Sequence, residues 1–374
     1  MSGIYVHVPF CKQACTYCDF HFSTSVKSRT ELLNAMILEL ELRKNEVSGT
    51  VSTIYFGGGT PSLLEPDRIA SFIEKCKTLF SVTIDAEVTL EANPDDITKE
   101  RLVQWLAAGV TRMSMGTQSF REDRLKFMGR AHTASEAMKG IELISKAGFA
   151  SWTIDLIYGL PQMDLNEWDE ELTIALDHGM PHLSAYCLTV EPRTVLAHQV
   201  QKGTVQMPGD DVQSAQFDRL MERMDLAGLD HYEISNFGKP GHWSRHNTSY
   251  WEGVPYVGVG PSAHSFNGTE RRWNVANNAR YVKAISEGQR FWEREKLTPA
   301  QRTNELLMTG LRTSSGVDRS KLEIDPFTIN SSAINNYVSK RHLFVTAERL
   351  VLSRAGRHFA DRIASDLFVP EDDR

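Results

Sequence analysis

Three cysteines near the beginning of the chain have a spacing that suits metal chemistry. They lie in the run Pro9-Phe10-Cys11-Lys-Gln-Ala-Cys15-Thr-Tyr-Cys18. An odd number of close cysteines suits neither a structural zinc, which takes four protein ligands, nor a set of disulfides, which needs an even number. Three thiolates can instead hold a cubane of four irons and four sulfides and leave one iron open to an outside ligand. On spacing alone, a partial metal site or buried thiols remain the alternative.

This cysteine run resembles the signature of the radical S-adenosylmethionine (SAM) family. The resemblance implies a 4Fe–4S cluster on Cys11, Cys15 and Cys18, with SAM bound to the open iron through its amino and carboxylate groups. It further implies that an electron from the cluster can cleave SAM to methionine and a 5′-deoxyadenosyl radical.

Composition excludes several other classes of protein. The apolar share of 41% and charged share of 24% are those of an ordinary globular chain, and 374 residues suffice for one large domain and a smaller one. A net charge of −7 without a Lys/Arg cluster argues against nucleic acid or an anionic membrane as the main partner. We expect no signal peptide, because the N-terminus has no basic region followed by an apolar core. We also expect no membrane span, because the sequence has no apolar run of the roughly 18 residues that a span needs. Cys76 and Cys187 are predicted to be buried thiols in a cytoplasmic protein.

Short β-branched runs alternate with amphipathic helical patterns over the first two-thirds of the chain. Strands are expected at 4–8, 52–56, 87–91, 112–116, 152–158, 182–190 and 230–234, and helices at 30–43, 67–80, 99–107, 135–146, 166–178 and 210–226. Thr133 and Glu136 form the pattern of a capping box. Such alternation predicts a parallel sheet with right-handed crossovers, and about six units favour a partial (β/α)6 barrel. Chemistry in such barrels lies on the loops at the C-terminal ends of the strands, which is where the cysteine run falls.

The pattern changes near Ser235. We therefore predict a radical SAM core over 1–235, a loop-rich connecting segment over 236–297, and a small helical, winged-helix-like module over 298–374. Within the last module, helices are expected at 305–311, 332–341 and 358–367, with a hairpin at 344–353.

The loops that follow the predicted strands carry the residues of the expected SAM site. The run Gly57-Gly58-Gly59-Thr60 lets the backbone approach a ligand closely, although such a run alone is a tight turn about as often. The acid Asp155 lies within an apolar strand, where a carboxylate needs a polar partner. By resemblance to the family, the SAM residues are Tyr5, Tyr17, Gly58, Gly59, Thr60, Glu91, Gln118, Arg130 and Asp155. Arg130 suits the SAM carboxylate because its planar fork pairs bidentately.

Nearly the whole chain resembles the oxygen-independent coproporphyrinogen III oxidase (HemN) group of that family. Two departures argue against the oxidase reaction itself. The oxidase pattern has a fourth cysteine two positions after the third, and here that position is Phe20. The oxidase also has a long segment before its cluster, whereas this chain reaches Cys11 at once.

A later motif resembles the HemW heme chaperones, which are relatives of that oxidase. The run Arg245-His246-Asn247-Thr-Ser-Tyr250-Trp251 matches their His-Asn-x-x-Tyr-Trp motif. A neutral imidazole can ligate heme iron, and aromatic rings can pack on a porphyrin. The alternative is local packing, in which His246 and Asn247 bond nearby backbone and Tyr250 and Trp251 pack between domains. His242 and His264 are competing candidates for the iron ligand.

Three functions are compatible with these resemblances. The first is a heme chaperone that binds heme and a SAM-liganded 4Fe–4S cluster and transfers heme to an acceptor protein, for which a membrane-bound cytochrome is one candidate. The second is a radical SAM oxidoreductase acting on a porphyrinogen; a third option is a cluster protein whose SAM site is regulatory. An electron donor such as flavodoxin or ferredoxin is the expected partner, nucleic acid is not, and a homodimer remains open.

Overall fold

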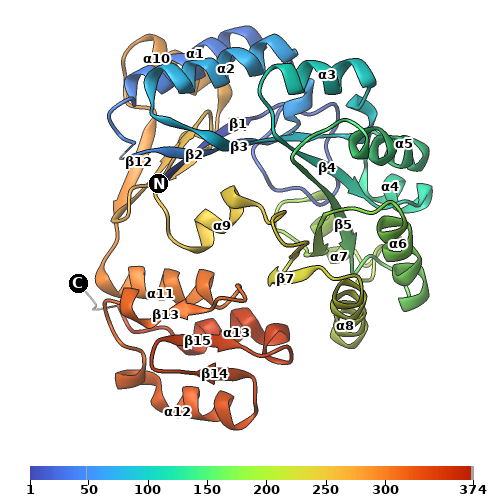
Figure 1. Cartoon of the computed structure of the whole chain (residues 1–374), viewed down its shortest axis with the longest axis vertical. Helices are drawn as coiled ribbons and strands as arrows, with labels where there is room; N and C mark the ends of the chain where they lie inside the picture. The colour runs from blue at the N-terminus through green and yellow to red at the C-terminus, as the bar shows by residue number, and fades with distance from the viewer. Residues whose placement is uncertain (48, 372–374) are drawn as a thin grey trace.

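The fold is known from a computed structural model that describes residues 1–47 and 49–371. Its centre is a run of parallel strands paired in sequence order, from β1 to β6. Their bounds are β1 Ser2–Val8, β2 Val51–Gly58, β3 Val82–Ala92, β4 Arg112–Gln118, β5 Ser151–Tyr158 and β6 His182–Cys187. The predicted partial barrel of about six strand–helix units is confirmed, and all six strands deliver their C-terminal ends to one edge of the sheet (Figure 1).

Helices follow the strands and cover the outer face of this sheet. They are α1 Arg29–Leu42, α2 Pro66–Leu79, α3 Lys99–Ala107, α4 Glu122–Met128, α5 Ala134–Ser145, α6 Leu165–Asp177, α7 Val195–Gln201 and α8 Asp210–Leu226. The predicted capping box is present at the start of α5, where Thr133 and Glu136 bond each other's backbone N–H groups. None of the described helices is both long and apolar enough to cross a membrane.

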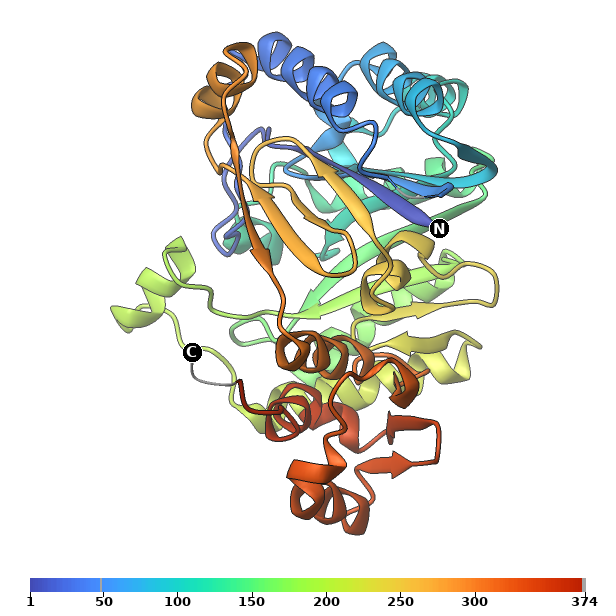
Figure 2. The same ribbon diagram turned by 90° about the vertical axis from the view of Figure 1, so that its left-hand side faces the viewer.

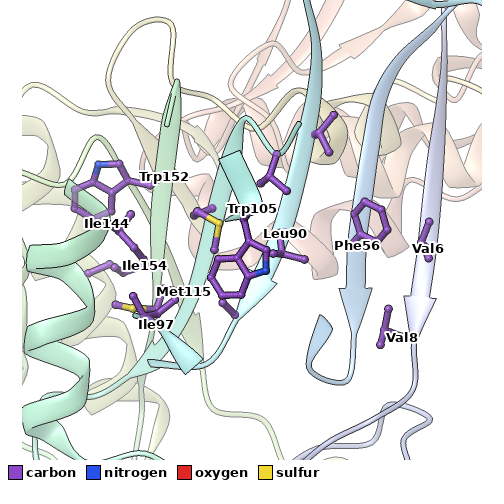
Figure 3. Close-up of a cluster of buried hydrophobic side chains, with 14 of the residues drawn as sticks. Val6, Val8, Phe56, Leu90, Ile97, Trp105, Met115, Ile144, Trp152 and Ile154 are labelled. Atoms are coloured by element: carbon purple, nitrogen blue, oxygen red, sulfur yellow. The ribbon is translucent and has the colours of Figure 1, made fainter. Parts of the chain in front are cut away.

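The main hydrophobic core lies between the strands and these helices. Figure 3 shows Phe56 of β2, Leu90 of β3 and Ile154 of β5, with Trp105 of α3 set against the sheet. All four side chains are fully buried. Burial of large side chains is the dominant stabilising term in such a fold, and it leaves the opposite face of the strands free to carry polar groups.

The segment 236–297 differs from the loop-rich connection that we expected. It contains β8 Asn236–Gly238, α9 Arg245–Trp251, β9 Tyr256–Val259, β10 His264–Phe266, β11 Glu270–Asn274, α10 Asn278–Ser286 and β12 Trp292–Lys296. These strands and β7 Asp230–Glu233 extend the sheet on both sides, so that the described strands run β12-β11-β10-β9-β1-β2-β3-β4-β5-β6-β8-β7. Figure 2 shows the orange strands of this segment beside blue β1. The glycine and proline content that suggested loops belongs to the tight turns between very short strands.

Strand β9 is parallel to β1, which therefore lies between β2 and β9. The buried ion pair of Arg43 and Glu39 holds β9 in place. The Arg43 guanidinium donates to Glu39 at 3.1 Å and to the Gly258 carbonyl at 2.6 Å. The other carboxylate oxygen of Glu39 accepts from the Gly260 N–H at 2.9 Å. Because both charges are buried, each needs these partners, and the arrangement locks β9 into register beside β1.

The C-terminal module has its own small core. It is built from α11 Pro299–Gly310, β13 Val317–Asp318, α12 Phe327–Ser339, β14 Leu343–Val345, β15 Arg349–Leu352 and α13 Ala360–Asp366. The predicted hairpin is confirmed as β14 and β15, which pair antiparallel. The module is tied to the barrel by an ion pair between Arg312 and buried Glu233 at 2.9 Å, and by His358 bonded to Asp218 of α8 at 2.8 Å.

Candidate functional site

A cavity of about 600 Å³ opens at the C-terminal ends of the parallel strands. It is lined by every predicted cluster and SAM residue except Tyr5: Cys11, Cys15, Cys18, Tyr17, Gly58, Gly59, Thr60, Glu91, Gln118, Arg130 and Asp155. These residues come from five separate strand ends and one loop, so the fold gathers what the sequence spreads over about 145 positions, from 11 to 155.

The cysteine loop is tied down between Cys11 and Cys15. The ammonium group of Lys12 contacts the carboxylates of Asp95 and Asp96, with an N–O distance of 2.6 Å to Asp96. The Gln13 amide donates to the Gly129 carbonyl at 2.6 Å. These contacts join the loop to the turns after β3 and after α4, so the thiols face the cavity from a fixed backbone.

Burial favours the neutral form of two of the three thiols when no metal is bound. Burial raises the pKa of Cys11, and it raises the pKa of Cys18 to about 11. Such thiols become thiolates when a metal binds them. Within residues 1–47 and 49–371, no three His, Cys, Asp or Glu side chains converge on one point as the ligands of a single ion do. A cubane cluster instead takes each cysteine on a different iron.

Arg130 is a cation whose partners in this structure are neutral. Its Nη2 donates to the Asn93 side chain at 2.7 Å and to the Gly116 carbonyl at 3.0 Å, and its Nη1 lies 3.4 Å from the Cys15 sulfur. Its Nε is buried with no partner in the described part of the chain. A guanidinium held in this way, without a carboxylate, is ready for an anionic ligand group.

Two acids line the cavity from β3 and β5. Burial raises the pKa of Glu91 to about 7, and the nearby charge of Asp155 adds to the shift. Burial also raises the pKa of Asp155 to about 6, opposed by hydrogen bonds from Ser184 and Ser114. Among the described residues neither acid forms an ion pair with a lysine or arginine. A ligand that brings a cation or hydroxyl groups would satisfy them.

The backbone of two site residues is in the left-handed region. Gly58 has φ +104°, and a Cβ there would lie 2.6 Å from the His7 ring, so only glycine fits. Gln118 has φ +65° without being glycine. That strained conformation is held by buried Glu171, which accepts from the Ser119 hydroxyl at 2.5 Å and from the Phe120 N–H at 2.8 Å. Strain supported in this way is typical of binding sites.

Tyr5 lies deeper than we expected. Its hydroxyl is 3.1 Å from Nδ1 of His7, and its ring centroid is 6.1 Å from that of Tyr55. It packs beneath the glycine turn, where a Cβ on Gly57 would come within 3.1 Å of it. Its contact with SAM therefore stays a prediction.

Several residues of the cavity were not predicted. They are Gln13, Asp19, Phe20, Phe22, Ala92, Asn93, Ser114, Gly116, Ala131, Ile157, Tyr186, Cys187, Leu188, Thr189 and Glu191. Tyr186 and Cys187 end β6, and the alternation of strand side chains was the available signal for their direction. Tyr186 is 42% exposed in the cavity, whereas Cys187 is not the fully buried thiol that we expected.

The His-Asn-x-x-Tyr-Trp motif forms the short helix α9, outside this cavity. The Nδ1 atom of His246 is 2.8 Å from the Thr53 hydroxyl, and its Nε2 is 2.8 Å from the Tyr250 hydroxyl. Burial lowers the pKa of His246 to about 3. The imidazole is 1% exposed, so a heme iron would have to break one of these hydrogen bonds to reach it. The imidazole is therefore held by local packing, although its partners are two side-chain hydroxyls and not the backbone groups of the alternative.

The other motif residues also lie outside the cluster cavity. Trp251 lines a cavity of about 140 Å³ against the C-terminal module, and its Nε1 is buried with no partner among the described residues. The backbone N–H of Asn247 is capped by Ser244 at 3.3 Å. Of the competing histidines, His242 has Nδ1 at 3.1 Å from the Ser151 hydroxyl, and His264 stacks on Trp273.

Comparisons with known proteins agree with this site. Residues 5–174 match the model of the radical SAM superfamily. The heme chaperone HemW of Bacillus subtilis is 33% identical over 328 residues, covering 86% of each chain. HemW of Mycobacterium tuberculosis strain H37Rv is 38% identical over 289 residues, which are 76% of this chain and 74% of the relative.

A solved structure with the same fold is that of coproporphyrinogen III oxidase (HemN) from Escherichia coli, a radical SAM enzyme. It superimposes with a TM-score of 0.84 over 98% of this chain and 90% of the oxidase, at 22% sequence identity. The likeness to the oxidase concerns the fold, while the sequence identity over most of the chain lies with HemW. The chain therefore belongs to the HemW family of radical SAM proteins.

Proposed function

We propose that this protein is a heme chaperone that binds heme, holds a SAM-liganded 4Fe–4S cluster and transfers the heme to an acceptor protein. The observation that carries the proposal is the 33% identity with the Bacillus subtilis heme chaperone over 86% of both chains.

The residues of the cavity fit the two cofactors. Cys11, Cys15 and Cys18 would hold the cluster, and Arg130 would take the SAM carboxylate because it has no other anionic partner among the described residues. Glu91 and Asp155 would bind the amino and ribose groups of SAM. These groups would provide the hydrogen bonds that a buried carboxylate needs. When bound, the cluster and SAM supply one-electron cleavage of the sulfonium.

A porphyrinogen oxidoreductase is the second candidate, favoured by the shared fold with HemN and the open cavity beside the cysteines. Phe20 stands against it. It lies where the oxidase pattern has its fourth cysteine, and its side chain is 66% exposed at the cavity.

The partners are proposed on the same basis. They are heme, a heme-accepting client, which could be a membrane-bound cytochrome, and an electron donor of the flavodoxin or ferredoxin type, with a cytoplasmic site of action. The heme residues His246, Asn247, Tyr250 and Trp251 remain a prediction, and a homodimer remains open.

The decisive experiment is anaerobic reconstitution of the cluster, followed by parallel assays of hemin binding, heme transfer to an apocytochrome and coproporphyrinogen III turnover. We expect binding and transfer without turnover. Turnover at the rate of a genuine oxidase, with no heme transfer, would refute the chaperone proposal.

A further inference from the structure

A second large cavity lies on the seam between the barrel and the C-terminal module. Its volume is about 560 Å³, within the range of small-molecule sites. One wall comes from the end of α8 and from β7, and the other from the segment between β15 and α13, with Trp243 between them. Figure 1 shows this seam between the yellow-green helix α8 and the red C-terminal elements. The cluster cavity has none of these lining residues.

Trp243 offers a flat apolar surface to this cavity. The indole is 37% exposed, although a tryptophan of this size is usually well covered. The ring of Tyr232 stacks on it, with centroids 4.8 Å apart and planes 9° apart, which fixes the indole plane. A second planar ring system can continue such a stack.

Two arginines line the same cavity without a carboxylate partner. The Arg357 guanidinium has no hydrogen bond or ion pair with any described residue, and Arg354 donates only to the Asp218 carbonyl, at 3.5 Å. Burial and the nearby charge of Arg354 lower the pKa of Arg357, and the charge of Glu233 opposes this shift. The carboxylates of Asp225 and Asp230 also line the cavity, but neither lies within 4.0 Å of an arginine nitrogen.

Two guanidinium groups without a close carboxylate, beside an oriented indole, point to a particular ligand chemistry. Guanidinium forks bind carboxylates bidentately, and unpaired, partly buried cations gain most from such a contact. The ligand should thus be planar and aromatic on one side and carry two carboxylates on another edge.

We propose that this seam cavity binds heme, with the porphyrin stacked on Trp243 and the two propionates held by Arg354 and Arg357. The assignment rests on the proposed heme-chaperone function and gives that function a location. None of these three side chains is an axial ligand of iron, and the Nε2 atom of His231, which also lines the cavity, lies 3.0 Å from the Ile234 carbonyl oxygen. The assignment also places the cargo between the two units of the fold rather than inside the cluster cavity.

The test uses the full chain with its cluster reconstituted anaerobically. Hemin is titrated into the wild type, the double variant Arg354→Gln/Arg357→Gln, Trp243→Ala, and a matched control Arg68→Gln/Arg362→Gln that removes two exposed arginines elsewhere. We expect the seam double variant to bind hemin at least about tenfold more weakly and the control to match the wild type. Hemin dimethyl ester, whose propionates are neutral, should bind the wild type and the seam double variant equally.

Each outcome decides a separate point. Cluster absorbance and thermal unfolding of the variants report whether they fold, so a loss of hemin binding with both preserved supports the site. Equal hemin affinity in the wild type and all variants overturns the seam site and leaves the chaperone proposal standing. A wild type that binds no hemin overturns the chaperone proposal, and the seam site with it.

Discussion

The imidazole of His246 stacks on the ring of Tyr55, with centroids 4.9 Å apart and planes 25° apart. The Tyr55 hydroxyl in turn donates to Oε1 of Glu91 at 2.7 Å. The motif helix α9 thus supports the proposed SAM site through the ring of Tyr55, and none of its residues lines the cavity. This relationship makes Tyr55 a positioning residue whose role can be separated from direct binding.

Tyr55→Phe removes the hydrogen bond that stabilises the charged form of Glu91. Because that bond holds the pKa down, its loss should raise the Glu91 pKa above about 7. We expect the SAM affinity at pH 7 to fall by about fivefold. The affinity increases with pH as Glu91 loses its proton, and the midpoint of that increase should move to higher pH. Calorimetric titration of the reconstituted protein over pH 6 to 9 measures both. Tyr158→Phe is the control, since the Tyr158 hydroxyl has no hydrogen-bond partner among the described residues; an unshifted profile in Tyr55→Phe would contradict the argument.

Glu91 should also leave a signature in stability without ligand. Its folded pKa of about 7 lies above its ordinary value, so between about pH 4.5 and 7 the folded state binds more protons than the unfolded state. Its contribution to the free energy of unfolding therefore falls as pH rises through that window. Denaturant unfolding of the apoprotein at pH 5 and pH 8 measures this effect. The free energy of unfolding of Glu91→Gln, relative to that of the wild type, should be higher at pH 8 than at pH 5. A constant difference between the two proteins would show that Glu91 titrates normally.

Lys12 should matter for the cluster although it binds no iron. Lys12→Met removes the contact between the cysteine loop and the turn carrying Asp95 and Asp96, which leaves those carboxylates without their lysine. We expect less iron per chain after reconstitution and faster loss of the brown absorbance in air. Lys27→Met, an exposed lysine on the same N-terminal segment, is the control and should keep full iron content.

Cys15→Ser tests which thiols hold the cluster. We expect it to lose iron and the cluster absorbance, because three cysteines are the minimum for a site-differentiated cubane. Cys187→Ser provides a strict comparison, since Cys187 lines the same cavity and should be dispensable. Iron loss in Cys187→Ser with retention in Cys15→Ser would reverse the assignment.

His246→Ala separates packing from iron ligation. It leaves the buried hydroxyls of Thr53 and Tyr250 without their shared partner, so we expect the free energy of unfolding to drop by about 3 kcal/mol. Because both ring nitrogens are already bonded, the hemin absorbance spectrum should not change. Loss of an axial-ligand band in this variant would instead place the heme iron on His246.

The parallel core was readable from the sequence because its strands are apolar and its helices amphipathic. The helix Lys99–Ala107 and the capping box at Thr133 were predicted as the structure has them. The charged strands β11 and β12 lacked that signal, since they lie at an edge of the sheet and are only partly buried. Their pairing depends on partners distant in sequence, which periodicity does not report.

In the site, the sequence predicts on which face of a strand a side chain lies but not how far it lies from the end of the strand. Strand alternation puts Tyr5 on the face opposite Ile4 and Val6, and the structure agrees, since those two neighbours are fully buried in the core. Tyr5 nevertheless lies about 10 Å below the end of its strand, because each residue advances a strand by about 3.3 Å. Whether a residue on this face lines the cavity or lies beneath it depends on its distance from the end of the strand. A match to a sequence motif does not report that distance.

The position of β1 between β2 and β9 has a consequence for how the protein is made. The strand that carries the cysteine loop is synthesised first, yet it gains its second neighbour only when residues 256–259 have left the ribosome. Until then its edge is open, and contacts this distant in sequence form late in folding. Iron–sulfur assembly factors would therefore meet a β1 with both neighbours only after more than two-thirds of the 374-residue polypeptide has been made.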